Sequence, residues 1–382
     1  MDKKIQSSVP WANQKKQEIE VINDSIAFPE NNSALSRLRS AGINHRIDDM
    51  KERLQRERSV IPDLISTGTV TLVYAPSGAG KTIWMLGCLL QSISSGLIRA
   101  DDVFYFNEDD GAQGLITKGE IARETGFTMI NLSSNFDDCL RSSNQALDLL
   151  SEIQVSQEAD GKIVILDTLK KFVPVLDKST VSRTFDVFRR FASAGGTVIL
   201  LGHTNKNRDS KGKLIFEGVG DLRSDVDNLY GFEPLHNKFS DYQELLVINE
   251  KDRQQESFEG GFKYRQTSSL LSYKESINSV SRIFSDEFDR LKKQNTANRN
   301  AQQAWQKYRN EFFFIQDNMK NGEKVAYSDL MDFCDDKELN PNCVSKKRLR
   351  NCMDLLKGNH LKEDRVGERN RQYFTWQRDW KV

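Results

Sequence analysis

A glycine-rich loop between a short apolar run and an apolar helical segment is the feature that most constrains the fold. The run Val70–Tyr74 leads into the sequence APSGAGKT, and the apolar stretch IWMLGCLLQSI follows it. Glycines let backbone N–H groups wrap a phosphate without Cβ clashes, and the N-terminus of the following helix adds the positive end of its dipole. The strand–loop–helix context therefore predicts a phosphate-binding P-loop, with Ala in place of the first glycine.

The loop residues have distinct expected tasks. Lys81 would neutralise the β- and γ-phosphates of a nucleoside triphosphate, and Thr82 would ligate Mg²⁺. Guanine recognition is disfavoured, because Asn205–Arg208 lacks the aspartate that such a motif needs at its end. We therefore expect ATP and Mg²⁺ as ligands. The loop residues expected to bind the nucleotide, together with Lys81 and Thr82, are Ala75, Pro76, Ser77, Gly78, Ala79 and Gly80.

Further short apolar runs follow the loop. They are Val103–Phe106, Ile163–Leu166, Val198–Leu201 and Leu245–Ile248. Helix-length segments separate the early runs. Short buried strands that alternate with helices predict an α/β fold with a mostly parallel sheet covered on both faces.

Acidic residues stand where two of these strands end. Asp167 follows Ile163–Leu166 and is the expected partner of Mg²⁺ and its water. Thr168, not Glu, comes next, so a catalytic base is sought at the end of the earlier strand, where Glu108 is the candidate and Asp109 its competitor. The carboxyl ends of parallel strands converge on the ligand, which would bring Glu108 to it. A solvated acidic turn is the alternative for this stretch.

His203 follows the run Val198–Leu201, with Gly202 between them. A polar side chain there could sense the γ-phosphate and signal its loss. A histidine that is only hydrogen-bonded within the structure is the alternative.

Five stretches together resemble the RecA-like ATPases, and within them the RepA-type hexameric replicative helicases. They are APSGAGKT, FNEDD, ILDTLKKF, ILLGHTNK and GVGDLRSDVDN, within roughly residues 60–255. The resemblance implies that Glu108 is the catalytic base and His203 the γ-phosphate switch. The family often has an arginine before the glycine of the last motif, where this chain has Glu217.

The resemblance also gives a role to two basic residues after Leu245–Ile248. RecA-like hexamers commonly carry a Lys-x-Arg pair here that points at the neighbouring subunit's nucleotide, and Lys251 and Arg253 have this spacing. Both side chains would lie on one face of an extended segment. Arg253 would then stabilise transition-state charge in trans, which requires a homo-oligomer, expected to be a hexamer. A solvated basic turn is the alternative.

Basic loops after the catalytic strands are expected to line the pore of such a ring and to hold single-stranded DNA, because phosphate charge dominates affinity. One loop contains Lys170, Lys171 and Lys178, and the other contains Lys206, Arg208, Lys211 and Lys213.

The C-terminal part is basic although the whole chain carries 55 Lys+Arg and 55 Asp+Glu. Residues 342–382 hold a net charge of +6. Helices over Trp305–Gln316 and Tyr327–Cys334, a third helix that starts at Asn340–Pro341, and a hairpin of Leu361–Val366 with Arg371–Trp376 predict a winged-helix-like domain. Its third helix would offer Lys346, Lys347 and Arg350 to nucleic acid, and a small protein-docking domain of the same shape is the alternative. A zinc site is disfavoured because Cys334, Cys343, Cys352 and His360 lack close ligand pairs.

These patterns divide the chain into four parts: a polar segment at 1–44, a RecA-like ATPase domain at 45–285, a linker at 286–300 and the winged-helix-like domain at 301–382. His45–Arg58 has the apolar spacing of a helix. The apolar runs are far shorter than the ~20 residues of a membrane span. Five cysteines without a CxxC pair and no apolar stretch after the charged start favour a reduced, cytoplasmic protein.

The expected function is an ATP-driven motor on single-stranded DNA, a RepA-like helicase. The alternatives are a non-motor DNA-binding ATPase, such as a recombination mediator or an ATP-switched regulator, and a P-loop small-molecule kinase, for which no acceptor-site motif is evident.

Overall fold

The computed structural model of the chain separates into two units, residues 1–57 and residues 58–382. In the first unit the helix α2 spans Ala34–Ser40, and most of the helix expected at 45–58 lies outside the described residues. The structure describes residues 34–40, 47–48, 51, 59–133, 140–173, 178–205, 208–209, 213–217, 222–235, 241–253, 258–266, 272–319, 322–357, 360–366 and 371–376.

A nine-stranded sheet forms the centre of the second unit, in the order β11-β10-β9-β8-β3-β7-β6-β4-β5. The six strands from β8 to β5 are parallel, and β9, β10 and β11 extend the sheet in antiparallel fashion. The α/β fold with a mostly parallel sheet is therefore confirmed. The strands are β3 (Val70–Ala75), β4 (Val103–Asn107), β5 (Thr128–Ile130), β6 (Ile163–Asp167), β7 (Thr197–His203), β8 (Asn228–Leu235), β9 (Tyr242–Asp252), β10 (Gly261–Arg265) and β11 (Ser281–Ile283).

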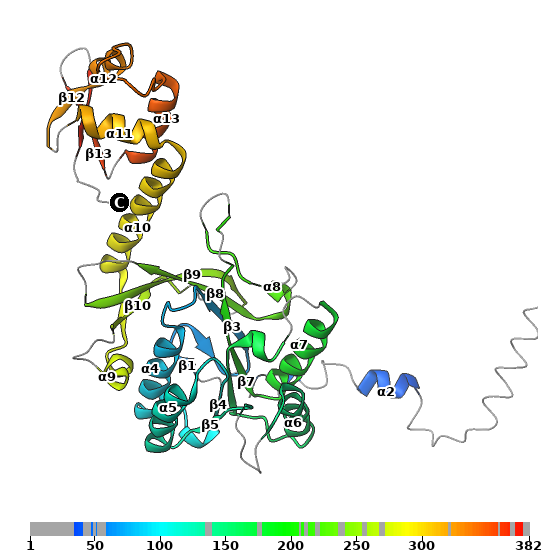
Figure 1. Cartoon of the computed structure of the whole chain (residues 1–382). Helices are drawn as coiled ribbons and strands as arrows, with labels where there is room; N and C mark the ends of the chain where they lie inside the picture. The colour runs from blue at the N-terminus through cyan, green and yellow to red at the C-terminus, as the bar shows by residue number, and fades with distance from the viewer. Residues whose placement is uncertain are drawn as a thin grey trace, which may run out of the picture. The chain divides into compact units, whose positions relative to one another are not determined.

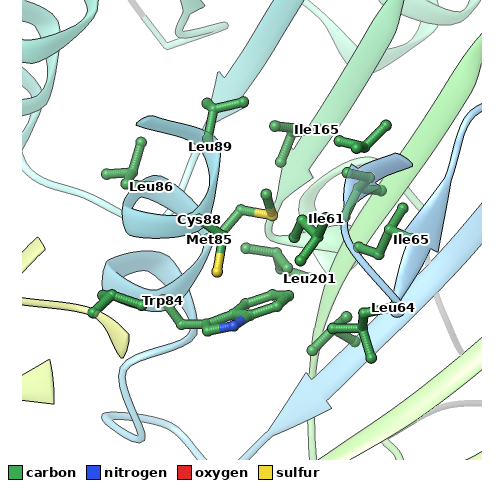
Figure 2. Close-up of a cluster of buried hydrophobic side chains, with 14 of the residues drawn as sticks. Ile61, Leu64, Ile65, Trp84, Met85, Leu86, Cys88, Leu89, Ile165 and Leu201 are labelled. Carbon is green, nitrogen blue, oxygen red and sulfur yellow. The ribbon is translucent and has the colours of Figure 1, made fainter. Parts of the chain in front are cut away.

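Helices cover both faces of the sheet (Figure 1). On one face α4 (Lys81–Ser94), α5 (Ala112–Thr125) and α9 (Tyr273–Asn278) pack over an apolar cluster that includes Trp84, Tyr105 and Ile165. Figure 2 shows Trp84, Met85 and Leu89 of α4 gathered with Ile165 and Leu201 of the sheet. On the other face α6 (Ser143–Val155) and α7 (Lys178–Ser193) bury Phe185, Phe188 and Phe191.

Short elements complete this part of the chain. The hairpin β1 (Ser59–Ile61) and β2 (Ile65–Ser66) precedes the sheet. The turns η3 (Ala100–Asp102) and η4 (Leu169–Lys171) flank β4 and β6, and α8 (Leu222–Asp225) leads into β8.

The C-terminal part has its own apolar core, in which Phe312, Leu349, Phe374 and Trp376 are buried. Its elements follow in the order helix, strand, helix, helix, strand, strand, and its sheet has the order β12-β14-β13. They are α11 (Arg309–Asn318), β12 (Lys324–Ala326), α12 (Tyr327–Phe333), α13 (Lys346–Leu356), β13 (Leu361–Val366) and β14 (Arg371–Trp376).

The polar segment 286–300, expected to be a linker, is helical and lies within α10 (Ser285–Lys307). Its buried positions include Phe288 and Leu291 near the start, but alanines farther along, so the apolar stripe is weak in the sequence. The single helix expected at Trp305–Gln316 is wrong, because the helix is interrupted at Tyr308, whose φ of −130° and ψ of 45° are not helical.

The helix start expected at Asn340–Pro341 is also wrong. The third helix begins at Lys346, and the Ser345 side chain caps it by accepting from the backbone N–H of Arg348. The Asn340 side chain instead organises the preceding loop: its amide donates to the carbonyl of Val344, and its oxygen accepts from the Val344 N–H at 2.7 Å.

Cys88, Cys334, Cys343 and Cys352, the cysteines that the structure describes, are free thiols. Within the same part of the chain no helix has both the length and the apolar character needed to cross a bilayer.

Candidate functional site

The glycine-rich loop has the local geometry of a phosphate cradle. Gly78 and Gly80 have φ angles of 73° and 92°, in the left-handed region that glycine adopts most readily. Tyr264 of β10 packs against Gly80 so closely that a Cβ at position 80 would fall 1.9 Å from its hydroxyl oxygen, and this hydroxyl donates to the carbonyl of Ala79 at 3.2 Å. Burial raises the pKa of Tyr264 to about 12. Glycine is thus required at position 80 both by φ and by space.

Lys81 begins α4 and is buried, with 6% of its surface exposed. Its ammonium donates to the carbonyl of Ala75 at 3.3 Å and lies 3.3 Å from Nδ1 of His203. Burial lowers the pKa of Lys81 to about 8, against the opposing charges of Asp167 and Asp109. Its hydrogen-bond partners among the described residues, which also include the carbonyl of Pro76, are neutral, so this buried cation is a suitable counter-charge for a phosphate.

The predicted magnesium residues are in direct contact. The Thr82 hydroxyl donates to Oδ2 of Asp167 at 2.7 Å, and the Tyr105 hydroxyl donates to the same oxygen at 2.8 Å. Burial raises the pKa of Asp167, while the Thr82 bond and the charge of Lys118 act in the opposite direction. A hydroxyl and a buried carboxylate side by side are oxygen ligands of the kind that Mg²⁺ prefers, so these residues fit the cation. Among the described residues no group of three or more His, Cys, Asp or Glu side chains could hold a metal ion by itself.

His203 ends β7 beside Lys81. Because an ammonium can only donate, Nδ1 is the acceptor of the 3.3 Å contact and the ring proton lies on Nε2. Burial and then the charges of Lys81 and Lys170 lower the pKa of His203, so the ring is neutral at physiological pH. The Nε2 atom is buried and has no hydrogen-bond partner among the described residues. A buried N–H donor without an acceptor beside a buried ammonium suits an anionic oxygen.

The two candidate bases differ in their contacts. The Glu108 carboxylate accepts from the backbone N–H of Leu132 and from the Ser133 hydroxyl, at the edge of the sheet. Its own backbone N–H donates to the carbonyl of Asp167 at 2.7 Å, which fixes its main chain next to the site. Asp109 lies nearer to the basic groups, with its carboxylate 3.8 Å from Nε2 of His203.

Residues 37–209 match the family described as an AAA domain. This part of the chain is therefore similar to a family of P-loop ATPase domains, and its mostly parallel sheet is consistent with a RecA-like core. The match ends before β8 and covers somewhat less than half of the chain. No curated protein matches the sequence. Among solved structures, the flagellar accessory protein FlaH from Methanocaldococcus jannaschii is similar, at 12% identity and a TM-score of 0.40, over 57% of this chain and 91% of that one.

Lys251 and Arg253 lie at the end of the sheet opposite the P-loop. Lys251 donates to the carbonyls of Arg223 and Val226, each at 2.6 Å, and Arg253 forms a 3.0 Å ion pair with Asp227. The other carboxylate oxygen of Asp227 accepts from the backbone N–H of Val70, where β3 begins. The P-loop follows the other end of β3, roughly 17 Å away at about 3.3 Å per residue.

The loops of the ATPase domain that were expected to contact nucleic acid are only partly described. Lys170 and Lys171 form the exposed turn η4, and Lys213 is also exposed. Arg208 makes a bidentate ion pair with Glu233, at 2.9 and 2.6 Å, and Glu233 is buried. Lys206, Lys211 and the side chain of Lys178 lie outside the described residues.

Of the three basic residues expected on the third helix, two have partners on neighbouring elements. Lys346 pairs with Asp335 at 2.7 Å, and the Arg350 guanidinium donates to the Tyr327 hydroxyl at 2.8 Å. Lys347 and Arg350 are exposed.

Sequence reasoning missed several residues of the site. Tyr105 and Tyr264 lie on strands and have only hydrophobic signals in the sequence. Lys118 of α5 is 4% exposed and forms an ion pair with Asp110, just beyond β4. The acidic run EDD is visible in the sequence, but no local pattern indicates which of its carboxylates pairs with a buried lysine.

Proposed function

We propose that this protein is an ATP-dependent single-stranded DNA translocase or helicase of the RepA type, which hydrolyses Mg-ATP at interfaces between identical subunits, six in a ring. The observation that carries the proposal is that Lys81 and Arg253 lie near opposite ends of β3: Lys81 follows its last residue, and Arg253 pairs with Asp227, which binds its first. A chain whose phosphate loop and candidate arginine finger lie at opposite ends of one sheet cannot use both on one nucleotide, but two copies can complete a site between them.

The residues have the following roles in this proposal. The P-loop N–H groups and Lys81 hold the β- and γ-phosphates, and Thr82 and Asp167 hold Mg²⁺, which when bound polarises the phosphate oxygens. Glu108 swings from Leu132 and orients and deprotonates the attacking water. Its backbone bond to Asp167 keeps it within reach of that position. The contact of Lys81 with Nδ1 keeps the ring proton of His203 on Nε2, and this Nε2–H donates to the γ-phosphate.

His203 is tied to a basic loop, which supports coupling between hydrolysis and DNA. The backbone N–H of Glu217 donates to the carbonyl of His203 at 2.9 Å, and Thr204 forms a bridge with Phe216. The segment between them holds Lys206, Arg208, Lys211 and Lys213. A movement of His203 on loss of the γ-phosphate would therefore move the base of a loop whose positive charge suits single-stranded DNA.

The experiment measures ATPase activity and strand displacement for the wild type, Lys81→Ala and a matched control, Lys162→Ala. Lys162 pairs with Asp102 near the start of β6, at the opposite end of that strand from the site. We expect Lys81→Ala to lose both activities and Lys162→Ala to keep them. Full ATPase activity in Lys81→Ala would refute the site assignment.

The paired Arg208 favours a second candidate, a non-motor DNA-binding ATPase such as a recombination mediator or an ATP-switched regulator. Its guanidinium is neutralised by buried Glu233, whereas Lys347 and Arg350 of the C-terminal part are exposed. Three helices followed by the hairpin of β13 and β14 support a winged-helix-like domain there, although β12, between the first two helices, was not expected. ATPase activity that single-stranded DNA stimulates without any unwinding, and DNA affinity that Lys347→Glu and Arg350→Glu abolish, would establish this function instead.

A further inference from the structure

A buried amide oxygen without a partner lies next to the magnesium residues. Asn107 is the last residue of β4 and is completely buried. Its Oδ1 atom makes no hydrogen bond with any described residue. Burying an acceptor without a donor is costly, so such an atom indicates a ligand or a water at that place.

The orientation of this amide is fixed by chemistry. The amide nitrogen of Asn107 lies 2.7 Å from Oδ2 of Asp110. The same carboxylate is ion-paired with the ammonium of Lys118, so it is ionised and can only accept. The NH₂ group of Asn107 must therefore face Asp110, and Oδ1 must face the other way.

Lys118 holds this arrangement in place. It is buried on α5, and its ammonium lies 5.7 Å from the centre of the Tyr273 ring. A buried lysine is stable only when it is paired, and Asp110 is the carboxylate that pairs with it. Gly114 leaves the space for Asp110, because a Cβ there would lie 2.9 Å from that carboxylate. The lysine thus fixes Asp110, and Asp110 fixes the amide.

The position of Asn107 relates its free oxygen to the cation residues. Asn107 is the register partner of Asp167 on the adjacent parallel strand. Tyr105 and Ile165, two residues earlier on each strand, pack on the α4 and α5 face, so Asn107 and Asp167 share that face. The Tyr105 hydroxyl already spans the two strands to reach Asp167. Neighbouring strands lie about 4.8 Å apart, which is the reach of one bridging water.

We propose that Asn107 is a positioning residue of the cation site: its Oδ1 accepts a hydrogen bond from a water in the shell of the divalent cation that Thr82 and Asp167 hold. Asp110 and Lys118 keep the amide in the orientation that this requires. The inference rests on the proposed nucleotide-dependent cation site, and it adds residues that the P-loop motif does not contain.

The test measures Mn²⁺ binding by electron paramagnetic resonance, with full-length protein and a non-hydrolysable ATP analogue. Asn107→Ala removes the acceptor, and we expect about tenfold weaker Mn²⁺ binding, the scale on which outer-shell partners act. Nucleotide affinity measured in chelator should not change. Asn107→Asp loses the donor to Asp110 but keeps an acceptor, and it should bind Mn²⁺ within about threefold of the wild type or tighter.

The matched control is Asn228→Ala. Asn228 is also buried with an unpartnered Oδ1, but it lies at the start of β8, away from the cation residues. We expect its Mn²⁺ affinity to equal that of the wild type. If Asn107→Ala does not fold, Asn107→Leu, which is close in size and has no acceptor, is measured in its place, with the same expectation.

Three outcomes would overturn the inference. Unchanged Mn²⁺ affinity in Asn107→Ala means that Oδ1 serves only a structural water, and equal losses in the Ala and Asp variants mean that the bond to Asp110 is what matters. If the wild type binds the analogue without any Mn²⁺ dependence, the proposed cation site itself fails, and this inference with it.

Discussion

At the scale of single residues, the site is a balance between a buried ammonium and carboxylates that only partly compensate it. Lys81, Lys170 and His203 lie close enough for each lysine to lower the pKa of the histidine, and burial adds to that effect. At Lys81, burial lowers the pKa, and the charges of Asp167 and Asp109 oppose this effect. In the nucleotide-free site, Lys81 and His203 therefore bind protons more weakly than free side chains do. The negative charge of a bound triphosphate would favour their protonated forms.

The lowered pKa of Lys81 predicts proton uptake on nucleotide binding. With a pKa of about 8, roughly half of the Lys81 side chains are neutral at pH 8, and a bound triphosphate would protonate them. We expect uptake on the order of half a proton at pH 8, very little at pH 6.5, and affinity that falls as pH rises above about 8. Calorimetry in two buffers with different ionisation enthalpies measures this uptake.

The control for this prediction is Lys81→Arg, because arginine stays charged throughout the range and should show no uptake. Equal uptake in the wild type and the variant would contradict it. The same shift makes the free protein more stable as pH rises from about 8 towards 10.5, because the unfolded chain then binds more protons than the folded one.

The two acidic residues at the end of β4 should separate in their kinetic effects. Glu108→Gln removes the proposed base, and we expect kcat to fall by at least a hundredfold while nucleotide affinity stays within about threefold. Asp109→Asn removes only a carboxylate charge 3.8 Å from Nε2 of His203 and should lower kcat by less. Single-turnover hydrolysis and equilibrium binding of a fluorescent nucleotide measure the two quantities. A larger loss in Asp109→Asn would reverse the assignment.

The site was predictable where the signal is local and not where it depends on tertiary contacts. The loop APSGAGKT and the carboxylate of Asp167 are visible in the sequence because the chemistry requires those residues beside a strand. Tyr264 lies 185 residues in sequence from Ala79, whose carbonyl accepts its hydrogen bond. Lys118 has the sequence signal of an ordinary polar residue in a helix. Their roles come from which strand and helix pack together, and no local pattern encodes that.

At the scale of elements, apolar strands were predictable and polar ones were not. β3, β4, β6 and β7 contain runs of Val, Ile, Leu or aromatic residues, and each predicted run lies inside its strand. β8, with the sequence NLYGFEPL, contains Gly, Glu and Pro, and its pairing between β3 and β9 supplies the order that its composition does not indicate. The helix α10 was not predicted either, because its polar composition does not indicate a helix.

The antiparallel extension of the sheet contributes to the P-loop through β10. Tyr264→Phe keeps the ring against Gly80 and removes only the hydrogen bond to Ala79. We expect the free energy of unfolding to fall by about 1 kcal/mol and nucleotide to bind several-fold more weakly, with kcat nearly unchanged. Denaturant titration and nucleotide titration measure the two effects. Tyr242→Phe, on neighbouring β9, is the control and should leave nucleotide affinity as it is; a matching loss there would remove the special role of Tyr264.

At the scale of the whole molecule, the proposed site is divided between the two ends of the sheet. Lys251 and Arg253 are bound within their own chain to the segment that joins α8 to β8, and Asp227 in that segment also holds the start of β3. In this arrangement Arg253 would have to exchange Asp227 for the phosphate of a neighbouring copy. The side chain of Arg253 is exposed, and exposed ion pairs contribute little to stability, so the free-energy cost of this exchange is small.

Mixing of subunits tests the divided site. Arg253→Ala should be inactive alone because each interface lacks its arginine, and Glu108→Gln should be inactive alone because each interface lacks its base. In a mixed assembly, an interface that combines Glu108 from an Arg253→Ala subunit with Arg253 from a Glu108→Gln subunit is complete. We expect ATPase activity to reappear and to peak near equal proportions. Since a site made within one chain can never be rescued in this way, the absence of activity at every ratio, in assemblies shown by mass to contain both subunits, would place hydrolysis inside the single chain.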